Sequence, residues 1–180
     1  MMTEWPEQTD AESMTERAGA TERIVAEEAL NPADARYAAM DLLARREHLQ
    51  RELETKLLKR FSALPDAREV IAGVVAALTA ENLQSDERFC EAYVRQRSAR
   101  GYGPERIQAE LSQKGAAESL AEHALATCEV DWRELAQQVR AKKFGPVVPT
   151  DWPGKSKQLR FLQYRGFSGD QLSRLDVNSE

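Results

Sequence analysis

The stretch from 93 to 115, YVRQRSARGYGPERIQAELSQKG, places five cations and two tyrosines around a Gly-Tyr-Gly-Pro turn. Lys and Arg bind phosphate and carboxylate, so the stretch could hold a negatively charged partner. Gly103-Pro104 opens a new helix, whose first backbone amides would favour an anion. Charge runs are also common on the solvated face of an amphipathic helix, and composition alone favours that second interpretation.

A second group of cations follows between 140 and 165, in a segment that contains few acidic residues. There the residues favour neither a binding surface nor a solvated one, and both interpretations stay open. The two groups together supply the residues that we expect to contact a partner. They are Arg95, Arg97, Arg100, Tyr102, Arg106, Lys114, Arg140, Lys142, Lys143, Lys155, Lys157, Arg160 and Arg165.

Motifs for enzymatic chemistry are missing from the sequence. His48 and His123 lie near no nucleophile motif, and there is no HExxH, Walker A or GxGxxG pattern. We interpret both histidines as surface or partly buried residues. Cys90 and Cys128 lack metal-ligand spacing and fit small core residues. The sequence therefore predicts a protein that is not an enzyme and that uses no cofactor.

The charge is unevenly distributed along the 180 residues. The formal net charge is −5, but residues 1–34 hold nine acidic and two basic groups, so the remainder is slightly basic. The longest apolar run, 70–78, is too short to cross a bilayer, and the first residues lack a secretory h-region. We expect a cytoplasmic protein with a mostly disordered acidic tail and no membrane contact.

Apolar periodicity predicts helices throughout, with no sustained strand alternation. In the first helix the apolar face is expected to carry Tyr37, Met40, Leu43 and Ala44, and Asn31 and Pro32 suit its N-terminus. Trp132 should begin a helix and pack in the core or between repeats, whereas Trp152 falls in a Pro- and Gly-rich connection. The other expected helices cover residues 48–61, 66–80, 86–97, 117–128, 132–144, 157–167 and 169–176.

The helical pattern recurs along the chain. Shifting residues 46–60 by 54 positions sets Leu53 over Ile107 and Leu57 over Leu111. Self-similarity at this period is typical of an array in which each unit buries its apolar face against the next. The sequence predicts an all-α fold with these parts: a tail over 1–30 and three-helix repeats over 31–83, 84–130 and 131–177.

Three motifs, in order, resemble the bacterial RecX family. They are DLLARREHLQRELETKLLKRF at 41–61, ENLQSDERFCEAYVRQRSARGYGPERIQAELSQKG at 81–115 and LRFLQYRGFSGDQL at 159–172. The resemblance spans about 34–176, and Leu49 and Cys90 depart from the usual serine and alanine. It implies an elongated, curved array of three tandem three-helix repeats without enzymatic activity.

The resemblance also implies the partners. RecX proteins bind the RecA recombinase, chiefly its filament on single-stranded DNA, and inhibit strand exchange, ATP hydrolysis and co-protease activity. We therefore expect a monomer that contacts RecA through its basic surface, with weak direct DNA binding. The alternative is a general helical DNA-binding or protein-interaction module unrelated to RecA.

Overall fold

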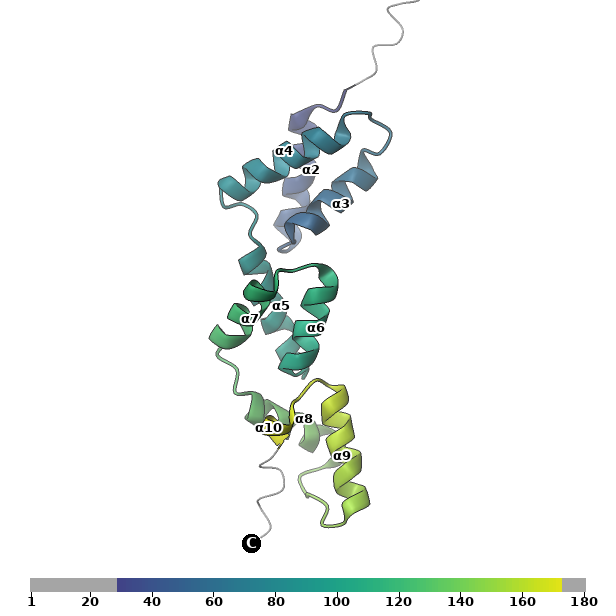
Figure 1. Cartoon of the computed structure of the whole chain (residues 1–180), viewed down its shortest axis with the longest axis vertical. Helices are drawn as coiled ribbons and strands as arrows, with labels where there is room; N and C mark the ends of the chain where they lie inside the picture. Colours follow the sequence, from purple (N-terminus) through teal and green to yellow (C-terminus); the bar gives the residue numbers. More distant parts are fainter. Residues whose placement is uncertain (1–28, 173–180) are drawn as a thin grey trace, which may run out of the picture.

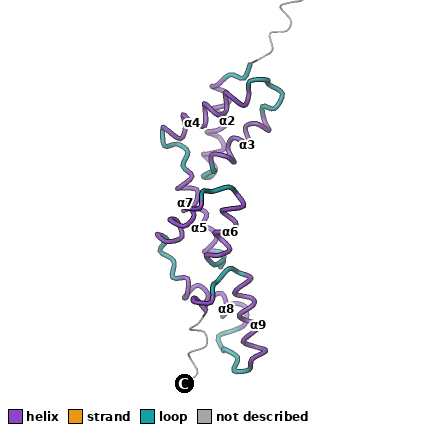
Figure 2. The backbone as a smooth tube through the Cα atoms, in the orientation of Figure 1, coloured by secondary structure: helices purple, strands orange, loops and turns teal. Residues whose placement is uncertain are grey.

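The computed structural model describes residues 29–172, and all regular structure in that range is helical. The helices form three groups that follow one another along the long axis of the molecule (Figure 1). Short loops join the helices inside each group, as the tube in Figure 2 shows. The predicted all-α repeat array is confirmed. The predicted acidic tail lies outside the described residues except for its last two.

The first repeat contains α2 (Pro32–Arg45), α3 (Gln50–Arg60) and α4 (Ala67–Ala80). Asn31 caps α2 by accepting a hydrogen bond from the amide of Ala33, as expected of this residue before a proline. The predicted apolar face of α2 is wrong at Tyr37, which is 77% exposed, and at Met40 and Ala44, which are also exposed, whereas Leu43 packs against the core. Small side chains face the core instead, which lets α2 and α4 pack closely. The buried residues of α2 are Ala35, Ala38 and Ala39.

The second repeat contains α5 (Asp86–Ala99), α6 (Pro104–Lys114) and α7 (Glu118–Thr127). Ile107 and Leu111 of α6 are fully buried, like Leu53 and Leu57 at the matching positions of α3. The internal repeat therefore predicted the core of both units correctly. Cys90 is buried beside them, and this burial raises the pKa of its thiol to about 11.

The third repeat contains α8 (Trp132–Phe144), α9 (Trp152–Tyr164) and α10 (Gly169–Leu172). The connection to α9 is shorter than predicted, because Asp151 accepts a hydrogen bond from the amide of Gly154 and starts the helix at Trp152. The core is small, with Ala136, Leu162 and Phe167 as its buried members. The predicted last helix beyond Leu172 lies outside the described residues.

Two junctions hold the repeats together. Leu49, which precedes α3, packs in the core of the second repeat, and Trp132 packs against the cores of the second and third. The buried side chain of Gln84 donates hydrogen bonds to the carbonyl of His48 and to the Asp86 carboxylate. Each repeat is thus anchored to its neighbour by side chains as well as by the chain itself.

Candidate functional site

Two turns from distant parts of the sequence meet between the second and third repeats. The amide of Gly103 donates to the carbonyl of Arg165 over 2.8 Å, and the amide of Glu105 donates to the carbonyl of Gly166 over 3.1 Å. The N-terminus of α6 therefore faces the C-terminus of α9, a favourable arrangement of helix dipoles. The expectation that these amides await an anion is wrong, because carbonyl oxygens occupy them.

The close approach at this junction requires glycine on both sides. A Cβ atom on Gly103 would lie 2.2 Å from the carbonyl oxygen of Gly166. Gly166 has φ +89°, in the left-handed region that favours glycine, and its own Cβ would lie 2.3 Å from the Cβ of Arg106. The Gly-Tyr-Gly-Pro and Arg-Gly-Phe motifs are therefore two halves of one contact.

Tyr102 lies at the centre of this contact and is surrounded by guanidinium groups. The ring centroid is 4.1 Å from the Cζ atom of Arg97, 4.5 Å from that of Arg106 and 5.1 Å from that of Arg165. Such stacking is favourable because the face of the ring is electron-rich. Tyr102, predicted as a contact residue, is half-buried and orients these arginines.

Glu110 of α6 neutralises part of this charge. Its carboxylate accepts hydrogen bonds from Arg97, Arg106 and the hydroxyl of Tyr93. The side chain of Arg97 is only 15% exposed. Two of the arginines predicted to contact a partner, Arg97 and Arg106, thus already have a partner inside the protein.

The Glu110 cluster predicts a pH-dependent stability. Burial raises the pKa of Glu110, but the hydrogen bonds from Arg97, Arg106 and Tyr93 outweigh it and leave the pKa below its ordinary value. A depressed carboxyl pKa stabilises the fold above the unfolded-state pKa, and this contribution is lost as the pH falls through the folded-state pKa. Glu110→Gln should lower the free energy of unfolding at pH 7 by about 2 kcal/mol.

The difference from the wild type should shrink as the pH falls below about 4. Urea unfolding at pH 7 and at pH 3 measures it, with Glu122→Gln on the exposed face of α7 as the control. An equal loss at both pH values would contradict the assigned role of Glu110.

Arg140 is also internal. It is 6% exposed, and its guanidinium donates to the carbonyls of Gly145, Pro146 and Val147 and to the side chain of Gln158. These bonds tie the α8–α9 connection to α8. Arg140 is therefore a buried structural residue and not a surface cation, although it is close in sequence to Lys142 and Lys143.

A groove of about 480 Å³ lies beside the glycine junction. It is bounded by the end of α5, by α8 and by the last turn of α9. Four cations line it, Arg100, Lys142, Lys143 and Arg165, and among residues 29–172 no carboxylate does. We name this the basic groove. It joins cations from both of the groups that the sequence singled out.

The remaining predicted residues are more scattered. Arg95 lines a different groove, where Glu91 and Glu129 offset its charge. Lys114 lies over the ring of Tyr93 at 5.5 Å. The basic residues of α9 extend away from the basic groove along that helix, and they are Lys155, Lys157 and Arg160.

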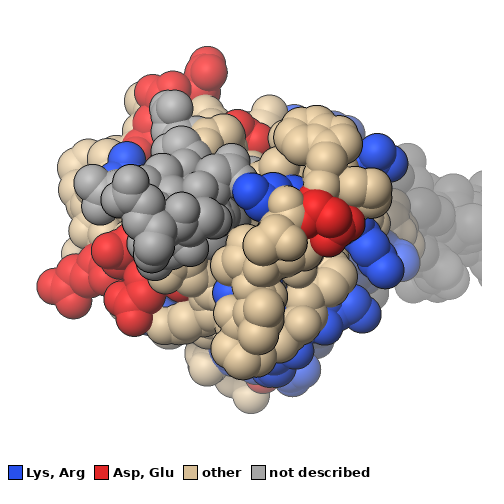
Figure 3. All heavy atoms as spheres, turned by 90° about the horizontal axis from the view of Figure 1, so that it is seen from below, with Lys and Arg blue, Asp and Glu red and all other residues tan. Residues whose placement is uncertain are grey.

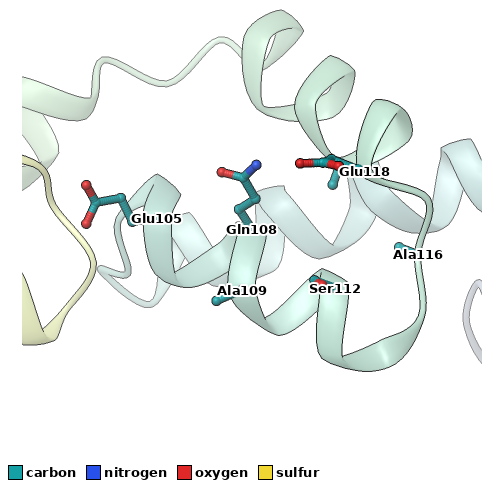
Figure 4. A pocket seen from close by; sticks show the side chains of 7 residues that line it. Glu105, Gln108, Ala109, Ser112, Ala116 and Glu118 are labelled. Atoms are coloured by element: carbon teal, nitrogen blue, oxygen red, sulfur yellow. The ribbon is translucent and has the colours of Figure 1, made fainter.

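Charge is segregated around the long axis. Seen from the α9 end, most Lys and Arg atoms gather along one flank and most Asp and Glu atoms along the opposite one (Figure 3). Another groove, between α6 and α7, has Glu105 and Glu118 on its walls (Figure 4). A polyanion therefore meets less repulsion in the basic groove than in this acidic one.

The structure also adds to what the sequence indicated. Tyr164, which sequence reasoning missed, is 77% exposed and follows Arg160 by one helical turn. His48 is buried rather than partly exposed, and this burial lowers its pKa. Among residues 29–172 no cluster of three or more potential metal ligands occurs, and no helix there is long and apolar enough to span a membrane.

The fold and the basic groove define a helical-repeat protein that presents a charged surface between repeats. Family models agree with that architecture: residues 85–125 match the second three-helix domain of RecX, and residues 129–175 match the third. The chain belongs to the RecX family.

Relatives named regulatory protein RecX are similar over most of the chain. The Pseudomonas putida GB-1 protein is 44% identical over 144 residues, which cover 80% of this chain and 90% of that protein. The Serratia proteamaculans protein is 41% identical over 155 residues, covering 76% and 92%. The crystal structure of RecX from Lactobacillus salivarius has the same fold, with a TM-score of 0.66 at 24% identity over 80% of this chain and 93% of that one.

Proposed function

We propose that this protein is a cytoplasmic, monomeric regulator that binds RecA and its filament on single-stranded DNA. It inhibits the recombinase, ATPase and co-protease activities by blocking filament extension or by destabilising the filament. Membership of the RecX family supports this role. The observation that supports the site is the basic groove, which the described part of the chain lines with four cations and no carboxylate. Binding, rather than a reaction on a substrate, is the function.

The physical basis is electrostatic. The side chain of Arg165 is held in place by the junction, since its guanidinium donates to the backbone carbonyls of Arg100 and Gly101, whereas the side chain of Arg100 is exposed. Lys142 and Lys143 are exposed on α8 and can follow the phosphates or acidic side chains of a partner. Contacts to phosphate release counterions, so the affinity for a DNA-containing filament should fall steeply as salt is added.

Charge reversal in the basic groove tests the proposal. Arg100→Glu/Lys142→Glu should require about tenfold more protein for half-maximal inhibition of DNA-dependent ATP hydrolysis by RecA, since two favourable contacts become repulsive. These residues are better targets than Arg97 and Arg106, whose reversal would also disrupt the Glu110 cluster.

The matched control is Lys59→Glu/Arg68→Glu, which changes the charge equally on exposed positions of the first repeat. It should inhibit like the wild type. Wild-type inhibition by a folded Arg100→Glu/Lys142→Glu variant would reject the basic groove as the contact surface.

A second candidate function is a general DNA-binding or protein-interaction module unrelated to RecA, because the charge of the groove fits many polyanions. Pull-down of RecA with and without single-stranded DNA distinguishes the two. Retention of RecA, strengthened by DNA, supports the regulator, whereas retention of DNA alone supports the general module.

A further inference from the structure

An exposed aromatic ring lies beside the basic groove. Tyr164 ends α9 and is 77% exposed, a large fraction for an aromatic side chain. The next residue, Arg165, lines the groove. Successive residues on a helix are about 100° apart, so the ring projects from the flank next to the groove wall.

Contacts from the second repeat fix the position of Tyr164. The guanidinium of Arg106 donates to the carbonyl of Tyr164 over 3.3 Å, and its Cζ atom lies 5.4 Å from the ring centroid. Glu110 in turn accepts a hydrogen bond from Nε of Arg106. The base of the ring is therefore anchored across the repeat junction while most of its surface faces solvent. A preorganised ring loses little entropy when a ligand stacks on it.

The charge around the ring is positive. Arg160 and Lys157 lie one and two turns before Tyr164 on the same face of α9, and both are exposed. Among the described helices α9 alone has no Asp or Glu between its first and last residue. An acidic protein surface could bind to the cations alone and would leave the aromatic ring without a role. A row of cations that flanks an open aromatic ring fits a ligand with both phosphates and planar bases.

We propose that the outer face of α9, together with the basic groove, binds single-stranded nucleic acid, with one base stacked on Tyr164. The phosphates contact Arg165 and the groove lysines on one side of the ring and Arg160 and Lys157 on the other. A duplex does not fit the ring, because its base faces are already stacked on each other. This inference rests on the proposed function only in taking the basic groove as an anion-binding surface.

Bare oligonucleotides, without RecA, test the platform. Fluorescence anisotropy at low salt compares oligothymidylate with an abasic oligomer of equal length, which keeps the phosphates but has no bases. The wild type should prefer oligothymidylate, and Tyr164→Ala should bind it about fivefold or more weakly while binding the abasic oligomer unchanged. Tyr164→Trp should restore the preference. Tyr37→Ala is the matched control, because Tyr37 is also 77% exposed but lies on α2.

Two outcomes of these binding measurements would overturn the stacking role of Tyr164. Equal binding of oligothymidylate by Tyr164→Ala and the wild type would overturn the stacking role. If Tyr164→Ala bound the bare oligomer normally but the RecA filament weakly, the ring would contact protein and the proposal would be rejected. Failure of the proposed function appears in a different assay, as unchanged inhibition of ATP hydrolysis by Arg100→Glu/Lys142→Glu.

Discussion

A Gly103→Ala variant should keep its first two repeats folded and lose the docking of the third. The backbone of Gly103 has φ −85° and ψ 168°, which alanine adopts readily, so the effect comes from contact alone. The new Cβ atom would lie 2.2 Å from the carbonyl oxygen and 2.7 Å from the amide nitrogen that follows it. Backbone atoms cannot rotate away as a side chain does, so the turns must separate.

Separation breaks several interactions at once. The hydrogen bonds from Gly103 and Glu105 to the end of α9 are lost, and Arg165 moves away from the ring of Tyr102. We expect a loss of about 3 kcal/mol or more for the docked third repeat. Hydrogen exchange should then report much faster exchange in α8 and α9, with little change in α3 and α4.

The same substitution elsewhere provides the control. A Cβ atom on Gly73, in the middle of α4, meets nothing within 4 Å, so Gly73→Ala should stabilise the first repeat by up to about 1 kcal/mol. Unchanged exchange in α8 and α9 of Gly103→Ala would show that the junction tolerates the methyl group and that its glycines are not required.

The core was predictable from sequence where large apolar residues recur at helical spacing. Leu53, Leu57, Ile107 and Leu111 were expected to be buried from the internal repeat alone, and all four are. The first helix followed this rule only in part, because its fully buried residues are alanines, which count less than Tyr37 in a pattern of large apolar residues. Of the predicted face, Leu43 packs against the core.

The candidate site was predictable only as a set of charges. Sequence shows that Arg97, Arg106 and Arg140 are cationic, but not that the Glu110 carboxylate or backbone carbonyls accept their hydrogen bonds. Those partners depend on tertiary contacts, as does the junction that joins residues 101–104 to 165–167. The basic groove therefore emerges once Arg97, Arg106 and Arg140 are set aside.

Phe167→Ala is expected to unfold the third repeat selectively. The ring is fully buried, and only Ala136 and Leu162 accompany it as buried core residues in the described part of this repeat. Replacing a core phenylalanine by alanine costs about 3–5 kcal/mol. The first repeat has many more buried residues to share such a loss. The third repeat, with its small core, is therefore expected to unfold when it loses this much stability.

Repeat arrays lose structure unit by unit when one unit is weakened more than the contacts that couple it to the next. Thermal unfolding of Phe167→Ala should therefore show an early transition of the third repeat, followed by the first two repeats near the wild-type temperature. Phe167→Leu keeps most of the volume and should cost less than about 1.5 kcal/mol. A single transition shifted as a whole would show instead that the three repeats unfold together.

Inhibition of RecA by the same variant distinguishes a general loss of stability from a loss of the basic groove. Lys142, Lys143 and Arg165 belong to the third repeat, so Phe167→Ala should inhibit RecA at least as poorly as Arg100→Glu/Lys142→Glu. Leu57→Ala is the matched comparison, because it costs a similar 2–5 kcal/mol but empties the core of the first repeat. At a temperature where Leu57→Ala still inhibits and Phe167→Ala does not, the contact surface must depend on the third repeat. Equal inhibition by both variants would place that surface elsewhere on the array.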